Sequence, residues 1–123
     1  MGASTEPTGV VKELFDGWRA KDIDRIANLF TDDAIYHNMP MDVIKGKDQI
    51  RQTIAGWLDA LPGMDFRFLN VVSGDNIIMM ERVDQIPREG GMHELPVMGV
   101  IELEGGKISA WREYFDMGQM RGS

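Results

Sequence analysis

The chain of 123 residues suits a single domain with one hydrophobic core, and we expect one domain over residues 1–123. A net charge of −7 argues against a nucleic-acid-binding protein, because phosphate backbones attract basic surfaces. The lack of cysteine excludes disulfides and thiolate chemistry, and two histidines cannot build a histidine-rich metal site. With no long apolar run and no secretory leader at its start, the chain is expected to be cytoplasmic and not membrane-bound.

The first half of the chain predicts three helices and one short strand. Apolar residues recur at helical spacing over 10–18 and again over 23–30. A short strand is expected over 34–38, which a Met-Pro pair ends because proline cannot donate to a ladder. A third amphipathic helix is expected over 47–61, before a Pro-Gly break.

The second half predicts strands. Alternating segments over 65–72, 77–86, 92–103 and 107–117 are separated by turn residues, with a looser loop at 87–91. Consecutive strands joined by short turns form an antiparallel meander. The order of elements therefore predicts an α+β domain, with helices covering one face of a curved sheet.

Three of the predicted strands place polar residues on a shared face, because residues i and i+2 of a strand point the same way. The sets are Tyr36 with Asn38, Arg82 with Asp84, and Glu113 with Trp111 and Phe115. If these faces converge in a cleft, two carboxyls, a guanidinium, a phenol and an amide could activate water and donate a proton without a metal.

Each set also has a plainer interpretation. Arg82 and Asp84 fit a surface ion pair equally well, and Tyr36 and Asn38 fit a strand end with local turn bonding. Periodicity does not decide which face of the last strand is buried, so a solvated carboxylate near its end, Asp116, remains a rival to Glu113. His37 points to the opposite face from its neighbours, which favours a structural role.

The ordered set of segments resembles the limonene-1,2-epoxide hydrolase family, within the cone-shaped NTF2-like and SnoaL-like superfamily. The similarity spans residues 10–117. The segments that carry it are Tyr36-His37-Asn38-Met39-Pro40, Gly46-Lys47-Asp48, Glu81-Arg82-Val83-Asp84, Gly99-Val100 and Gly106-Lys107-Ile108 leading into Trp111-Arg112-Glu113-Tyr114-Phe115-Asp116. The resemblance implies a curved mixed sheet covered by three N-terminal helices, a homodimer, and catalysis without a cofactor.

The resemblance also implies roles for the polar residues. Tyr36 and Asn38 match the positions that hold the water, Arg82 matches the arginine between two carboxyls, and Asp84 matches the proton donor. The position of the water-activating aspartate holds Glu113, which is a departure from the family. An added methylene moves the carboxyl, and displacements near ~1 Å can cost about a hundredfold in rate.

The implied substrate is a small apolar epoxide, terpene-like or cyclic, which water opens to a vicinal diol. Bulky Trp18 and Trp57 would shrink or reshape the pocket. The expected substrate-binding residues are Phe15, Trp18, Trp57, Leu61, Phe66, Met80, Ile86, Leu95, Val97, Trp111 and Phe115. Glu113 leaves open an epoxide-opening cyclase or a proton-transfer enzyme like ketosteroid isomerase, and a non-catalytic small-molecule binder is a further alternative, because this superfamily hosts many functions.

Overall fold

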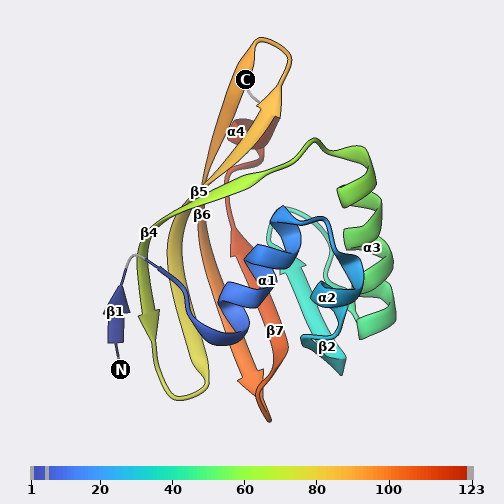
Figure 1. Ribbon diagram of the computed structural model, residues 1–123, viewed down its shortest axis with the longest axis vertical. Helices are drawn as coiled ribbons and strands as arrows, with labels where there is room; N and C mark the ends of the chain where they lie inside the picture. Colours follow the sequence, from blue (N-terminus) through green and yellow to red (C-terminus); the bar gives the residue numbers. More distant parts are fainter. Residues whose placement is uncertain (1, 5, 122–123) are drawn as a thin grey trace.

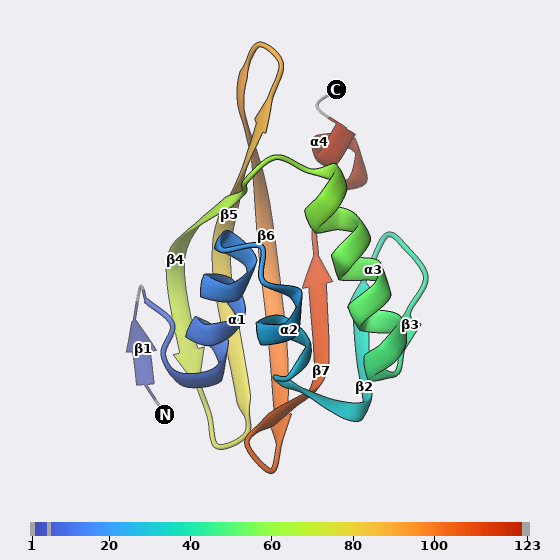
Figure 2. The ribbon, with the colours of Figure 1, turned by 45° about the vertical axis from the view of Figure 1, so that its right-hand side comes forward.

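The computed structural model describes residues 2–4 and 6–121 and contains one seven-stranded sheet with helices against it (Figure 1). The helices are α1 (Gly9–Arg19), α2 (Ile23–Ala27), α3 (Lys47–Ala60) and α4 (Met117–Arg121). The strands are β1 (Gly2–Ser4), β2 (Phe30–Asn38), β3 (Ile44–Lys45), β4 (Asp65–Ser73), β5 (Ile77–Arg88), β6 (Gly91–Glu104) and β7 (Lys107–Tyr114). Figure 2 shows α1, α2 and α3 in front of the sheet, and the expected α+β architecture is confirmed.

The sheet is mixed, in the order β1-β4-β5-β6-β7-β2-β3. Among the described strands, β2 and β7 pair in parallel and the other neighbours pair antiparallel. The parallel register places Tyr36 beside Trp111 and Asn38 beside Glu113. Two segments far apart in the sequence therefore bring their polar residues to the same part of the sheet.

The core lies between the sheet and the apolar faces of α1 and α3. Helical spacing puts Leu14, Phe15 and Trp18 of α1 on its buried side, as predicted. The buried residues of α3 are Ile50, Ile54 and Leu58. These side chains pack with residues of the sheet in one continuous cluster. None of the helices in the described ranges has the length and apolar character that crossing a membrane requires.

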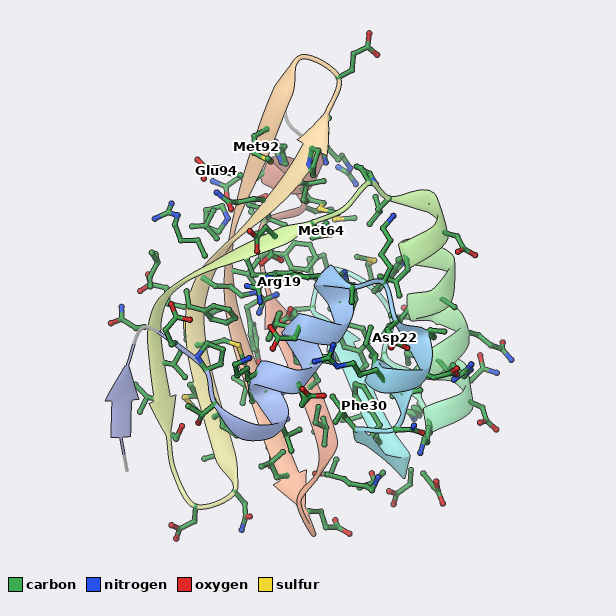
Figure 3. All side chains as sticks on the ribbon, in the orientation of Figure 1. Arg19, Asp22, Phe30, Met64, Met92 and Glu94 are labelled. Atoms are coloured by element: carbon green, nitrogen blue, oxygen red, sulfur yellow. The ribbon has the colours of Figure 1, made fainter. Side chains whose placement is uncertain are left out.

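The predicted second helix is too long. It ends at Ala27, after Asp22 caps its start by accepting the Arg25 N–H at 3.2 Å, and Phe30 already belongs to β2 (Figure 3). Phe30 is 1% exposed and pairs with Ile108 in the parallel ladder. Its apolar character therefore reflects burial in a strand, although it falls at helical spacing from α2.

Two further boundaries differ from prediction. The residues expected in a loop at 87–91 mostly extend a long hairpin, because β5 continues to Arg88 and β6 begins at Gly91. Gly90 and Gly91 make this tight turn with φ values of 92° and 136°, which favour glycine. The last strand ends at Tyr114 instead of residue 117, and α4 follows it; α4, β1 and β3 were not predicted.

Candidate active site

A cavity of about 310 Å³ lies between the inner face of the sheet and the helices. Apolar side chains make most of its wall, and four polar or charged residues that are themselves buried face it: Asn38, Arg82, Asp84 and Glu113. The full lining is Phe15, Trp18, Tyr36, Asn38, Met41, Trp57, Ala60, Leu61, Met64, Phe66, Arg82, Asp84, Ile86, Leu95, Val97, Trp111, Glu113, Phe115 and Met120.

Arg82 bridges two carboxyls at the polar end of this cavity. Its Nε donates to Asp84 Oδ1 at 2.7 Å, and its Nη2 donates to Asp84 Oδ2 at 3.2 Å. Its Nη1 donates to Glu113 Oε2 at 2.9 Å, and Nη2 also donates to Glu113 Oε1. The guanidinium thus forms a two-bond contact with each carboxyl, which fixes the position of both acids.

The sheet register explains why these three residues meet. Arg82 and Asp84 lie on one face of β5, and Glu113 lies on β7, two strands away. Gly99 of β6 stands between the two strands, directly opposite Glu113, and carries no side chain to block the contact. The ring of Phe15 lies 4.9 Å from the guanidinium carbon, so α1 covers the arginine.

Burial controls the charge of this group. Arg82, Asp84 and Glu113 are 2%, 6% and 3% exposed. Burial raises the pKa of Glu113, although Arg82 opposes this effect. Burial also disfavours the charge on Arg82, but the two carboxylates outweigh it and raise the pKa of Arg82. With both carboxyls ionised the three residues would carry one net negative charge, so the apolar surroundings favour one bound proton.

Tyr36 and Asn38 complete the polar end of the cavity from β2. Burial, and then the charge of Glu113, raise the pKa of the Tyr36 phenol, so its hydroxyl stays protonated and able to donate. The Tyr36 ring stacks on Trp111, with ring centroids 4.2 Å apart and planes within 9°. The stack fixes the phenol beside Glu113, where phenol and amide can hold a small polar molecule.

The Trp111 side chain has one unusual polar atom. Its indole N–H is buried and makes no hydrogen bond within the described residues. It still lies close enough to Glu113 to lower the pKa of that carboxyl, the smallest of the effects that act on it. Trp111 therefore provides a flat apolar wall and a weak electrostatic contact to the carboxylate.

The other polar residues near these strands lie outside the cluster around Arg82. Asp116 is exposed and accepts the Gly118 N–H at 2.7 Å at the start of α4. His37 is half-buried, and its Nε2 lies 3.0 Å from the Met41 carbonyl oxygen. Arg112 pairs with Glu102 on the opposite face of β7. The inner face of the last strand is therefore the one that carries Glu113.

Comparison with known protein families identifies the family to which this fold belongs. The SnoaL-like domain model matches residues 11–111, which is most of the chain. The chain belongs to the SnoaL-like domain family. Its fold is that of the NTF2-like proteins, as predicted from the ordered segments.

Several relatives of this SnoaL-like domain have a named activity. The chain is 24% identical over 110 residues to epoxide hydrolase EphG of Mycobacterium tuberculosis, covering 89% of this chain and 73% of EphG. A structure of an LEH-like epoxide hydrolase of M. tuberculosis superposes with a TM-score of 0.79, at 22% identity over 92% of this chain and 84% of the other. SalBIII, an epoxide hydrolase/cyclase-like enzyme in pyran ring formation of salinomycin, gives 0.76 at 19% identity, covering 89% and 90%.

Most of the predicted pocket residues of this SnoaL-like domain line the cavity, but Met80 does not. Met80 is fully buried in the core, deeper than Arg82 along the same face of β5, and it is absent from the cavity wall. The sequence prediction was wrong here because sharing a strand face does not place two residues at the same depth. The structure adds Met41, Ala60, Met64 and Met120 to the wall, and Figure 3 labels Met64 on the segment between α3 and β4.

Proposed function

We propose that this protein is a cofactor-independent epoxide hydrolase that adds water to a small apolar epoxide. The observation that carries the proposal is the buried Arg82, which holds Asp84 and Glu113 together at the polar end of an apolar cavity. Epoxide opening needs a proton on the departing oxygen and a nucleophile at carbon. Two carboxyls that share one proton can provide both functions.

In the proposed mechanism, Tyr36 and Asn38 hold a water next to Glu113. Glu113 removes a proton from the water as its oxygen bonds to an epoxide carbon. The bond between that same carbon and the ring oxygen breaks, and Asp84 donates its proton to the ring oxygen as it leaves. The raised pKa of Glu113 makes its carboxylate a stronger base toward the water. The product is a vicinal diol with inversion at the attacked carbon, and the proton returns from Glu113 to Asp84.

The cavity favours a small uncharged substrate. Its volume of about 310 Å³ and its aromatic and aliphatic wall suit a terpene-like or cyclic epoxide. A phosphorylated substrate would face two buried carboxylates and one arginine already paired to both. We therefore propose that the reactants are an apolar epoxide and water.

The cytoplasmic location stays a prediction, with which the lack of cysteine is consistent.

An epoxide-opening cyclase is the second candidate. The likeness to SalBIII favours it, because that protein is described as a hydrolase/cyclase-like enzyme with the same fold. In that reaction a hydroxyl of the substrate itself would replace the water beside Glu113, and the same proton transfers would follow. A substrate with an internal hydroxyl then closes a ring and takes no oxygen from the solvent.

We also propose that the protein forms a homodimer through the outer face of the sheet. Large apolar side chains are exposed there on neighbouring strands, at Val72, Met79, Met98 and Tyr114. The register places Val72 opposite Met79 and Met98 opposite Tyr114, so the residues form adjacent rows across β4 to β7. This face lies opposite the cavity, so a second copy could bind without closing it.

The deciding experiment is single-turnover hydrolysis of a panel of cyclic and terpene epoxides in ¹⁸O-labelled water. We expect diol with one labelled oxygen from the wild type and none from Glu113→Gln. Unlabelled cyclic ether from a hydroxy-epoxide would favour the cyclase instead. No turnover of any epoxide, together with retained binding of apolar ligands, would contradict both proposals.

A further inference from the structure

Gly99 occupies an unusual place in the middle of the active-site sheet. It lies in β6, paired with Met80 on one side and with Glu113 on the other. Its φ angle lies outside the left-handed region, so the backbone itself does not require glycine. The reason for glycine must therefore be the space that a side chain would fill.

That space holds the contact between Glu113 and Arg82. A Cβ at position 99 would lie 2.5 Å from Glu113 Oε2 and 2.9 Å from Arg82 Nη1. Those two atoms are the partners of the 2.9 Å hydrogen bond between the two side chains. A third neighbour, Met80 Cγ, would be 3.3 Å away. Ordinary Cβ contacts are longer than 3.4 Å, so alanine does not fit without movement.

The side chains that would have to move are held on their other sides. The guanidinium is fixed by Asp84 through two hydrogen bonds and is covered by the ring of Phe15. Met80 is fully buried in the core. The Glu113 carboxylate borders the cavity, so it is the group that can retreat. A methyl group at position 99 would push it off Arg82 and toward the cavity.

We infer that Gly99 is a positioning residue, whose missing side chain makes the space in which Glu113 meets Arg82. Glutamate reaches farther than the aspartate expected at this position, and its inner oxygen ends where a Cβ would begin. The catalytic consequence rests on the proposed function, whereas the effect on the carboxyl does not. The test therefore measures both turnover and the state of Glu113.

The first comparison is Gly99→Ala against Gly56→Ala. Gly56 is exposed in α3 with nothing near its added Cβ, so this matched variant should keep full activity. We expect Gly99→Ala to lower kcat about a hundredfold with little change in KM, because a displacement near ~1 Å removes the alignment of the base. Carbon-13 NMR of labelled glutamate should report a higher Glu113 pKa in this variant, because burial remains and the contact that opposes it weakens.

The second comparison adds Glu113→Asp to each background. A shorter acid withdraws the atom that meets the new methyl group, so Glu113→Asp should lower kcat by a smaller factor in Gly99→Ala than in the wild type. If Gly99→Ala alone fails to fold, recovery of the folded state in the double variant supports the inference. Equal factors in both backgrounds, or failure of the double variant to fold, would overturn it.

The two proposals fail in different ways. If no epoxide is turned over but the Glu113 pKa still rises in Gly99→Ala, the proposed reaction is wrong and the positioning role stands. If epoxides are hydrolysed and the Glu113 pKa and kcat are the same in both glycine variants, Gly99 does not position the base.

Discussion

Arg82 determines what the two carboxyls can do, because among the described residues that line the cavity it is the one with a positive charge. It contacts both acids through forked pairs and stays charged despite its burial. Replacing one partner of such a buried pair leaves an uncompensated charge, which costs about 3–5 kcal/mol in stability. The individual roles are therefore best separated by substitutions that keep the shape of each group.

Asp84→Asn tests the proton donor while keeping the shape of its contacts. An amide cannot transfer a proton to the epoxide oxygen, so kcat should fall by roughly a hundredfold to ten-thousandfold. Binding of an unreactive apolar analogue should change little, because the cavity wall is intact. Single-turnover kinetics and ligand titration measure the two quantities. Asp75→Asn, in an exposed turn, is the control and should keep the wild-type rate; a similar loss there would contradict the assignment.

Glu113→Gln should stabilise the protein at neutral pH, because the folded state disfavours the charge on this acid. Its pKa is raised on folding, so its contribution is most favourable below the ordinary value of 4.5, where both states are protonated. Stability is then lost as pH rises from 4.5 to the raised pKa. Glutamine stays neutral, so the Tm of the variant relative to wild type should increase as the pH rises above the ordinary pKa of 4.5.

The control for this pH dependence is Glu13→Gln, which should show the opposite sign. The hydrogen bonds from Arg25 lower the pKa of Glu13, so the exposed acid contributes stability above its ordinary pKa and loses it in acid. Its glutamine variant should have a slightly lower Tm at neutral pH, and this difference should shrink as the pH falls below the ordinary pKa of 4.5. A falling Tm difference for Glu113→Gln as pH rises would show that its charge is stabilising instead.

At the scale of elements, α4 and the long β5–β6 hairpin together form part of the cavity wall. Arg88 Nη2 donates to the Met120 carbonyl at 2.5 Å, and His93 Nε2 donates to the Gln119 carbonyl at 2.6 Å. Met120 also packs against the hairpin residues Ile86, Leu95 and Val97 and lines the cavity. The hairpin therefore holds a short helix that could not be stable alone.

Met120→Ala tests whether α4 limits substrate size. Removing a flexible side chain from the cavity wall leaves room for a larger ring but loses apolar contact with a small one. We expect KM for the smallest epoxides to rise about tenfold, which corresponds to the loss of one or two methylene contacts, while kcat/KM for bulkier epoxides improves. Gln119→Ala, on the exposed side of the same helix, should change neither. Equal effects of both variants on all substrates would place α4 outside the specificity site.

At the scale of the whole molecule, sequence periodicity predicted the helices and strands better than it predicted which of them contact one another. The stripes of α1 and α3 and the alternation in β4, β5 and β6 are local signals. That Asn38 lies beside Glu113 depends on parallel pairing of β2 with β7, which no local pattern encodes. The i, i+2 spacing predicted the three polar faces, and the resemblance of the ordered segments predicted that Arg82 lies between two carboxyls; the roles of these residues stay predictions.

Local patterns also missed residues that reach the cavity by tertiary packing. Met64 lies on the segment after α3, and Met120 lies in a helix that the hairpin holds in place. Nothing in their sequence neighbourhood distinguishes them from other methionines. Gly99 is a similar case, because its role depends on two side chains from other strands.

The exposed apolar residues on the outer face of the sheet allow the proposed homodimer to be tested. If a second copy covers this face, Met98→Glu buries an unpaired charge in an apolar interface, at a cost of about 3 kcal/mol or more. Sedimentation velocity should then report a dissociation constant raised at least roughly a hundredfold, with a monomer at low concentration. Because Met98 points away from the cavity, the monomer should keep its catalytic rate.

Met92→Glu is the matched control, since Met92 is exposed on the projecting hairpin (Figure 3) and its substitution should leave the dimer intact. A wild type that sediments as a monomer at all concentrations would refute the dimer, and equal effects of the two variants would place the interface elsewhere.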